Sequence, residues 1–156
     1  MIDSLEAYIE YFKTLADNHA KVKSFIYGPS ERLLNDLRTN TDLPVFWLMN
    51  PTVRANKHDE DGEVWNVGFI IFDGAEIDDW EKENEVEQCT LDIAKQFIAR
   101  LKEEDCDKIE LYGSFNLDPC QPWAADNLHG WRVELQMIVE QGCFEDDVDE
   151  AVWVDQ

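Results

Sequence analysis

Two short runs in the middle of the chain are apolar on both alternating faces, and they limit the folds open to it more than any other feature. They are residues 45–49 (VFWLM) and 67–72 (VGFIIF). Successive side chains of a strand point to opposite sides of a sheet, so such strands belong in the middle of a sheet that is covered on both faces. The polar, turn-rich segment 56–62 between them predicts an antiparallel hairpin with a long loop.

Three further segments have the spacing or the boundaries of helices. Residues 4–19 place apolar side chains on one helical face, and residues 30–38 can form a short helix after the Gly28-Pro29 break. Residues 79–104 predict the longest helix. Its apolar stripe consists of Val86, Thr90, Ile93, Ala94, Phe97, Ile98 and Leu101.

The remaining strands are predicted from shorter patterns. Residues 22–27 can form a short strand, and residues 109–117 alternate apolar and polar side chains. Residues 131–139 alternate with Ile138 as the single exception, which is typical of a strand at or near a sheet edge with one face in water. Residues 118–128, with Pro119 and Pro122, are interpreted as a linker.

This order of elements predicts an α+β protein. We expect a mostly antiparallel sheet of four to five strands with two long helices packed on one face. The domain should span residues 1–144, and residues 145–156 form an acidic C-terminal tail. The two apolar strands would expose hydrophobic surface on the second face unless another layer or another subunit covers it.

The chain is strongly acidic, which restricts its partners. Its 156 residues include 13 basic and 35 acidic side chains, for a formal charge of −22. Such a surface repels nucleic acid and anionic lipid, so we expect no nucleic-acid binding through basic groups and no membrane binding. Self-association, or another protein as partner, is the favoured interpretation.

Location and cofactors are predicted from what the sequence lacks. The first residues are acidic and do not resemble a secretory signal, and no apolar stretch approaches the roughly 20 residues of a membrane span. The four cysteines are far apart without a CxxC pair, which favours free thiols in a reducing compartment over zinc or disulfides. We therefore expect a cytoplasmic protein without a cofactor.

One part of the chain raises the alternative that the protein is an enzyme with a catalytic centre. Cys120, His129 and either Asp126 or Asn127 lie within one stretch of ten residues, and a thiol with an imidazole partner is the minimum for nucleophilic catalysis. Proximity in sequence is weak support, however, and Pro119-Cys120-Gln121-Pro122 is typical of a rigid loop. The prediction is that the protein is not an enzyme and has no catalytic residues; the alternative requires that a thiol reagent labels Cys120 fastest.

The segment His58 to Glu63, which includes the acidic run from Asp59, gathers oxygen ligands and raises the question of a calcium site. Aligned on Gly62, an EF-hand loop would require its first ligand at Lys57 and its bidentate glutamate at Gly68. Both positions lack a carboxylate. The segment is predicted to be a solvated loop without a metal.

Six tryptophans are many for a chain of this length. Trp47, Trp65 and Trp131 lie in strand-like runs, where core packing explains them. Trp123 and Trp153 lie in linker or tail surroundings, where large amphipathic rings often anchor protein interfaces. For these two the sequence leaves packing and interface open.

Two stretches carry a resemblance to known proteins: "FIIFDGAEIDDWEKENEVEQC", which leads into the long helix, and "NLHGWRVELQMIVEQGCF", with its Gly-x-Arg-Val-Glu strand. With the order of elements over residues 1–144, they resemble small α+β proteins of bacteroidete genomes and prophages. More loosely, the chain is similar to phage tail-terminator and tail-completion proteins. That family is structural and forms rings that cap a tube through which DNA passes.

The resemblance implies a non-enzymatic ring subunit, with carboxylates in the lumen that keep DNA from sticking. Trp123 and Trp131 would then lie near subunit contacts, with Trp153 as a further interface residue. The alternative is an acidic immunity or inhibitor-type protein that neutralises a basic partner, because charge complementarity accelerates such encounters. Native mass in solution separates a ring from a one-to-one binder.

Overall fold

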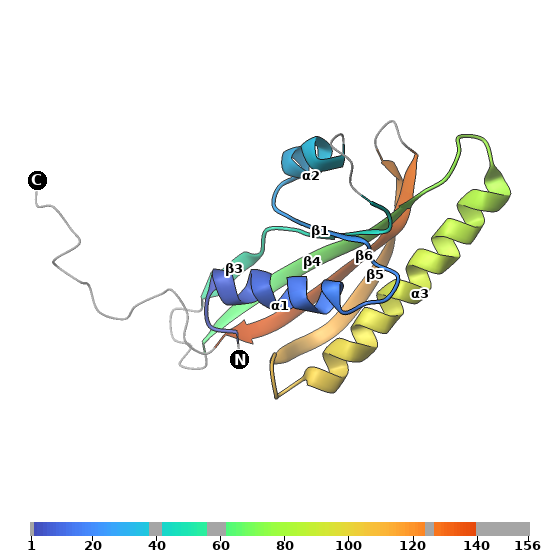
Figure 1. Ribbon diagram of the computed structural model, residues 1–156. Helices are drawn as coiled ribbons and strands as arrows, with labels where there is room; N and C mark the ends of the chain where they lie inside the picture. Colours follow the sequence, from blue (N-terminus) through green and yellow to red (C-terminus); the bar gives the residue numbers. More distant parts are fainter. Residues whose placement is uncertain (1, 38–41, 56–61, 124–126, 140–156) are drawn as a thin grey trace, which may run out of the picture.

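The computed structural model describes residues 2–37, 42–55, 62–123 and 127–139. In these ranges, helices lie on both sides of a single twisted sheet (Figure 1). The elements in chain order are α1 Leu5–Asp17, β1 Ser24–Tyr27, α2 Ser30–Leu37, β2 Val45–Leu48, β3 Thr52–Ala55, β4 Glu63–Gly74, α3 Trp80–Glu104, β5 Leu111–Trp123 and β6 Leu128–Val139.

Strand β4 is the centre of the sheet, whose order is β1-β2-β4-β6-β5. One side of β4 pairs with β6 along its whole length, and the other side pairs first with β3 and then with β2. Among the described strands, only β1 and β2 run parallel to each other; the other pairs are antiparallel. The predicted pairing of the two apolar runs is confirmed, because Val45 lies opposite Phe72 and Leu48 opposite Phe69.

The predicted fold class is confirmed, but the number of elements is not. The sheet has six strands instead of four to five, and of the three described helices only α3 is long. The strand that sequence reasoning missed is β3, which has four residues. It is too short to display a periodicity of two, and its pairing with β4 places it in the sheet.

The predicted linker 118–128 is also wrong for most of its length. Strand β5 continues through Pro119 and Pro122 to Trp123, and β6 begins at Leu128. Proline has no N–H to donate to a neighbouring strand, which disfavours it in a central strand. It is tolerated in an edge strand, where this position faces solvent. Among the described residues β5 pairs with β6 alone, so it is such an edge, and the pairing shifts register around Gly113 and after Cys120.

The main core lies between the sheet and the pair α1 and α3. Its residues include Tyr8 and Phe12 of α1, the stripe of α3, and alternate side chains of the strands. Every member of the stripe predicted for α3 is buried. Phe46 of β2 lies at its centre: its ring centroid is 4.7 Å from that of Phe69 and 5.0 Å from that of Phe97.

A smaller core covers part of the second face. Alternation sends Val45, Trp47, Ile70 and Phe72 to this side, where they pack with Leu33 of α2. Helix α2 is therefore the additional layer that the two apolar strands required. No helix in the described ranges combines the length and apolar character needed to cross a bilayer.

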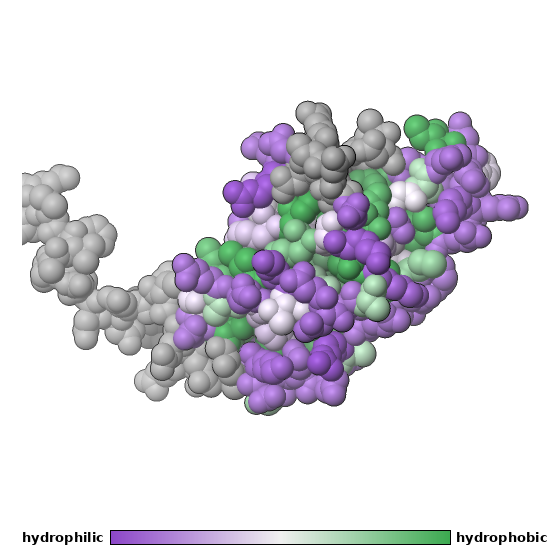
Figure 2. Space-filling view, viewed as in Figure 1, coloured by the Kyte–Doolittle hydropathy of each residue, from purple (hydrophilic) through white to green (hydrophobic). Residues whose placement is uncertain are grey.

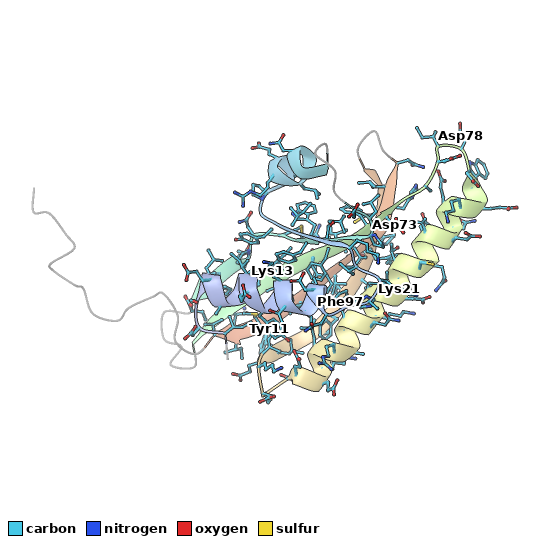
Figure 3. The ribbon with its side chains drawn as sticks, viewed as in Figure 1. Tyr11, Lys13, Lys21, Asp73, Asp78 and Phe97 are labelled. Atoms are coloured by element: carbon cyan, nitrogen blue, oxygen red, sulfur yellow. The ribbon has the colours of Figure 1, made fainter. Side chains whose placement is uncertain are left out.

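Helices α1 and α3 are also joined by polar contacts where they converge. The Tyr11 hydroxyl of α1 donates to the Glu104 carboxylate of α3, and burial, followed by the contact with Glu104, raises the pKa of Tyr11. Nearby, the His19 ring stacks on Phe97 with centroids 5.0 Å apart. Tyr11 and Phe97 lie in the space between the two helices (Figure 3), where they line a groove of about 670 Å³.

Candidate functional site

The two residues of the suspected catalytic pair lie on opposite faces of the sheet. Cys120 lies opposite Gly130 in the β5–β6 pairing, and its side chain packs against the smaller core. His129 is the neighbour of Gly130 in β6, so its side chain points to the other face, towards α3. The sheet separates the thiol from the imidazole, and the two cannot act together.

His129 belongs instead to a partly buried polar cluster that ties α3 to the end of the sheet. Only 3% of the residue is exposed, and its Nε2 lies 3.0 Å from the Asn127 side-chain oxygen. The Asn127 amide donates to the Glu83 carboxylate of α3 at 2.9 Å, and Glu87 Oε1 lies 3.4 Å from His129 Nδ1. These contacts fix the position of the start of α3 against β6.

The surroundings of Cys120 do not activate it as a nucleophile. Burial raises the pKa of its thiol; Arg132 acts in the opposite direction and Asp118 in the same one. A reactive cysteine needs a lowered pKa and access, because the thiolate is the attacking species. The separation from His129 and the raised pKa therefore both argue against Cys120 as a catalytic nucleophile.

We expect iodoacetamide at pH 7 to label Cys120 more slowly than Cys89, which is exposed. Below the pKa of a thiol the thiolate fraction rises about tenfold per pH unit, so labelling of Cys120 should accelerate as the pH is raised. Mass spectrometry of the digested protein follows each cysteine separately. If Cys120 reacted fastest at pH 7, the result would support the alternative that Cys120 is a catalytic nucleophile.

The acidic segment considered for calcium lies mostly outside the described residues, which exclude 56–61. Glu63 is described: it is buried at the start of β4, and its carboxylate accepts a hydrogen bond from the Trp65 indole at 3.3 Å. Within the described part of the chain, no group of three or more histidine, cysteine, aspartate or glutamate side chains is placed to hold a metal ion.

The three tryptophans proposed as interface residues have different surroundings. Trp131 is partly buried against the main core, and its indole N–H donates to the Glu87 carbonyl oxygen at 2.9 Å. The backbone of Trp123 pairs with Leu128 in the β5–β6 hairpin, and Trp153 lies outside the described residues. The most exposed tryptophan described is Trp80, at 74%, which sequence reasoning did not select.

A large hollow lies on the second face, over the part of the sheet beside α2. It has a volume of about 750 Å³. Its floor is polar: the Gln136 amide of β6 donates to Asn66 of β4 at 2.7 Å, and Arg132 pairs with Glu134 on β6. Its lining also includes Gly28 and Pro29 before α2 and Ser30 at the start of α2, Trp47, Met49, Asn50 and Thr52 from the β2 to β3 region, and Gly113, Ser114 and Asn116 of β5.

We call this hollow the sheet groove, and its side chains are suited to recognition. The ionic groups among its lining residues are Arg132 and Glu134, which pair with each other. Amides, hydroxyls and the apolar Met49 can contact a polypeptide surface, but none of them is a general base or an activated nucleophile. The alternation of β6 predicted this wet face, but the walls come from segments distant in sequence.

The comparisons with known proteins add no relative to this description. The chain matches none of the models of protein families and none of the curated proteins with which it was compared.

Proposed function

We propose that the protein is a non-enzymatic assembly subunit that associates with copies of itself, in a ring of the phage tail-terminator kind. The resemblance of the element order and of the Gly130 to Glu134 strand to that family favours this function. The structural observation that carries the proposal is the sheet groove, an open and preformed concave surface beside α2.

The arrangement of the sheet is compatible with a closed ring. Its two outer strands differ, because β1 has four residues and β5 has thirteen. Contacts between two unlike surfaces of identical subunits are heterologous, and they close into a ring when the rotation between subunits permits it. The sheet groove and a different surface of the neighbouring copy would form such a contact.

The charge of the chain agrees with this role. A formal charge of −22 gives a ring lumen a negative potential, which repels the phosphates of DNA that passes through. The same charge makes subunits repel one another at low ionic strength, and added salt screens this repulsion. Assembly is therefore expected to strengthen as salt is raised.

The test is the native mass by light scattering coupled to size exclusion, at high protein concentration and at roughly 0.15 and 0.5 M salt. A discrete multiple of the monomer mass supports the proposal. A strict monomer under both conditions contradicts it.

The double variant Ser114→Arg, Asn116→Arg is expected to convert the assembly to monomers. Both side chains are exposed on β5 and line the sheet groove, so bulky cations there block a partner without disturbing the core. The matched control is Asn84→Arg, Gln88→Arg, two exposed positions of α3 across the sheet. An unchanged mass for the groove variant would place the subunit contact elsewhere.

The second candidate is the acidic inhibitor-type protein, which the net charge of −22 favours. This function requires a basic protein partner bound one to one and does not require self-association. A monomer that forms an equimolar complex with a basic protein would support it over the ring.

A further inference from the structure

Two large apolar side chains project from the start of α3, one from the turn before the helix and one from its first residue. Ile77 is 70% exposed and Trp80 is 74% exposed, which makes them the most exposed large hydrophobic residues described. Figure 3 places Asp78, which lies between them in sequence, at an outer corner of the molecule, and Figure 2 shows apolar surface at that corner, bordered by hydrophilic surface. We call Ile77 and Trp80 the α3 tip.

The backbone that carries the α3 tip is held in place by hydrogen bonds. The Asn127 amide donates to the carbonyl oxygens of Ala75 at 3.2 Å and Glu76 at 3.3 Å. The backbone N–H of Asp79 donates to the Glu76 carbonyl oxygen at 3.2 Å, and the Asp79 carboxylate caps α3. A side chain presented on a fixed backbone loses less conformational entropy when it is bound.

The surface around the α3 tip is strongly negative. Its one cation between positions 76 and 85 is Lys82, which pairs with Glu85 at 3.6 Å. The exposed carboxylates in this stretch are Glu76, Asp78, Asp79, Glu81 and Glu85. Exposed apolar side chains within a charged rim are the pattern of an interface centre, because binding energy concentrates in large side chains that the rim protects from water.

The negative charge of this rim determines which kind of partner the α3 tip can bind. A second copy of the chain carries 35 acidic and 13 basic residues, so a copy that docked at this acidic rim would meet more repulsion than at the sheet groove, whose ionic residues Arg132 and Glu134 pair with each other. A cationic segment meets attraction instead. A guanidinium can stack on the Trp80 ring while an apolar neighbour covers Ile77, and the carboxylates pair with the remaining cations.

We propose that the α3 tip docks a cationic segment of another protein, one in which arginine or lysine alternates with an apolar side chain. This interaction is separate from ring assembly, because it uses a different surface and a different partner. The α3 tip would bind such a segment equally in a ring and in a monomer.

The test uses a fluorescently labelled ten-residue peptide of alternating arginine and leucine, with a glutamine–leucine peptide of equal length as the charge control. Fluorescence anisotropy with the full chain should show binding of the arginine–leucine peptide alone. The variant Ile77→Ser, Trp80→Ser should bind it at least tenfold more weakly, although every carboxylate is kept. Because both side chains are exposed, the variant should retain the wild-type circular dichroism spectrum.

The matched control is Leu5→Ser, Tyr112→Ser, which removes the other two exposed large hydrophobic side chains described and should leave the affinity unchanged. The variant Glu76→Gln, Asp78→Asn, Glu81→Gln should also weaken binding at least tenfold. Equal affinity of the Ile77, Trp80 variant and the control variant would overturn the proposal, because the peptide would then bind the acidic surface in general. Self-association of the wild-type chain that is lost in the Ile77, Trp80 variant would overturn it as well, because the occupant would be a second copy.

Discussion

Replacing Gly130 by alanine is expected to destabilise the protein more than any other single methyl group added to the sheet. A Cβ at this position would lie 1.9 Å from the Ile71 carbonyl oxygen and 2.8 Å from the Ile71 carbonyl carbon. Both atoms belong to the backbone of the neighbouring strand β4, so the two central strands must separate by about an ångström. We expect a loss of roughly 3–5 kcal/mol, a large part of the 5–15 kcal/mol that stabilises a typical domain.

Urea unfolding followed by tryptophan fluorescence measures this loss. At a slope of roughly 2 kcal/mol per molar urea, the midpoint should fall by about 2 M or the variant should fail to fold. Gly68→Ala is the matched control on β4, where the added Cβ would meet the flexible end of Met49 at 2.4 Å and no backbone atom closer than 3.9 Å. It should cost about 1 kcal/mol or less, since methionine adapts readily. Equal losses for both variants would show that the close approach of the strands is not the cause.

Replacing Phe46 by alanine is expected to produce the second large effect. The side chain is fully buried, and its ring contacts four others: Phe12 of α1, Phe25 of β1, Phe69 of β4 and Phe97 of α3. Removing it leaves a cavity where both helices meet the sheet. The expected loss is about 3–5 kcal/mol, as for other buried aromatic residues truncated to alanine.

The unfolding of this variant should be followed by far-ultraviolet circular dichroism and by fluorescence, and both midpoints should fall together. Phe25→Ala is the control on the neighbouring strand, because Phe25 is only partly buried and its one described ring contact is with Phe46. It should cost roughly 1–2 kcal/mol, in proportion to the apolar area that it buries. A wild-type midpoint for Phe46→Ala would contradict the central role of this ring.

Gly130 also shows how a sequence signal can be explained only by a structure. The Gly-x-Arg-Val-Glu strand supported the resemblance to tail-terminator proteins, but the sequence contains no reason for its glycine. In the fold this residue lies opposite Phe72, where the backbones of β4 and β6 approach closely. The glycine is therefore explained by packing, whatever the function of the protein.

The candidate sites illustrate a different limit. The spacing of Cys120 and His129 permitted a catalytic pair, and only the register of the β5–β6 hairpin, with Cys120 opposite Gly130, sends the two side chains to opposite faces. A shift of one residue would have reversed this result. The exposure of Trp80 likewise depends on where the end of the sheet places the start of α3, although its neighbouring acids are plain in the sequence.

The sequence by itself determined the elements with a clear period: the stripe of α3, the doubly apolar strands β2 and β4, and the alternating strand β6. It determined them because burial repeats every 3.6 residues in a helix and every two in a strand, which is local information. Only the tertiary structure decided the order of the strands, the inclusion of β3 and of the proline-containing β5, and the formation of the sheet groove. These depend on pairings between segments far apart in the chain, whose register no local period records.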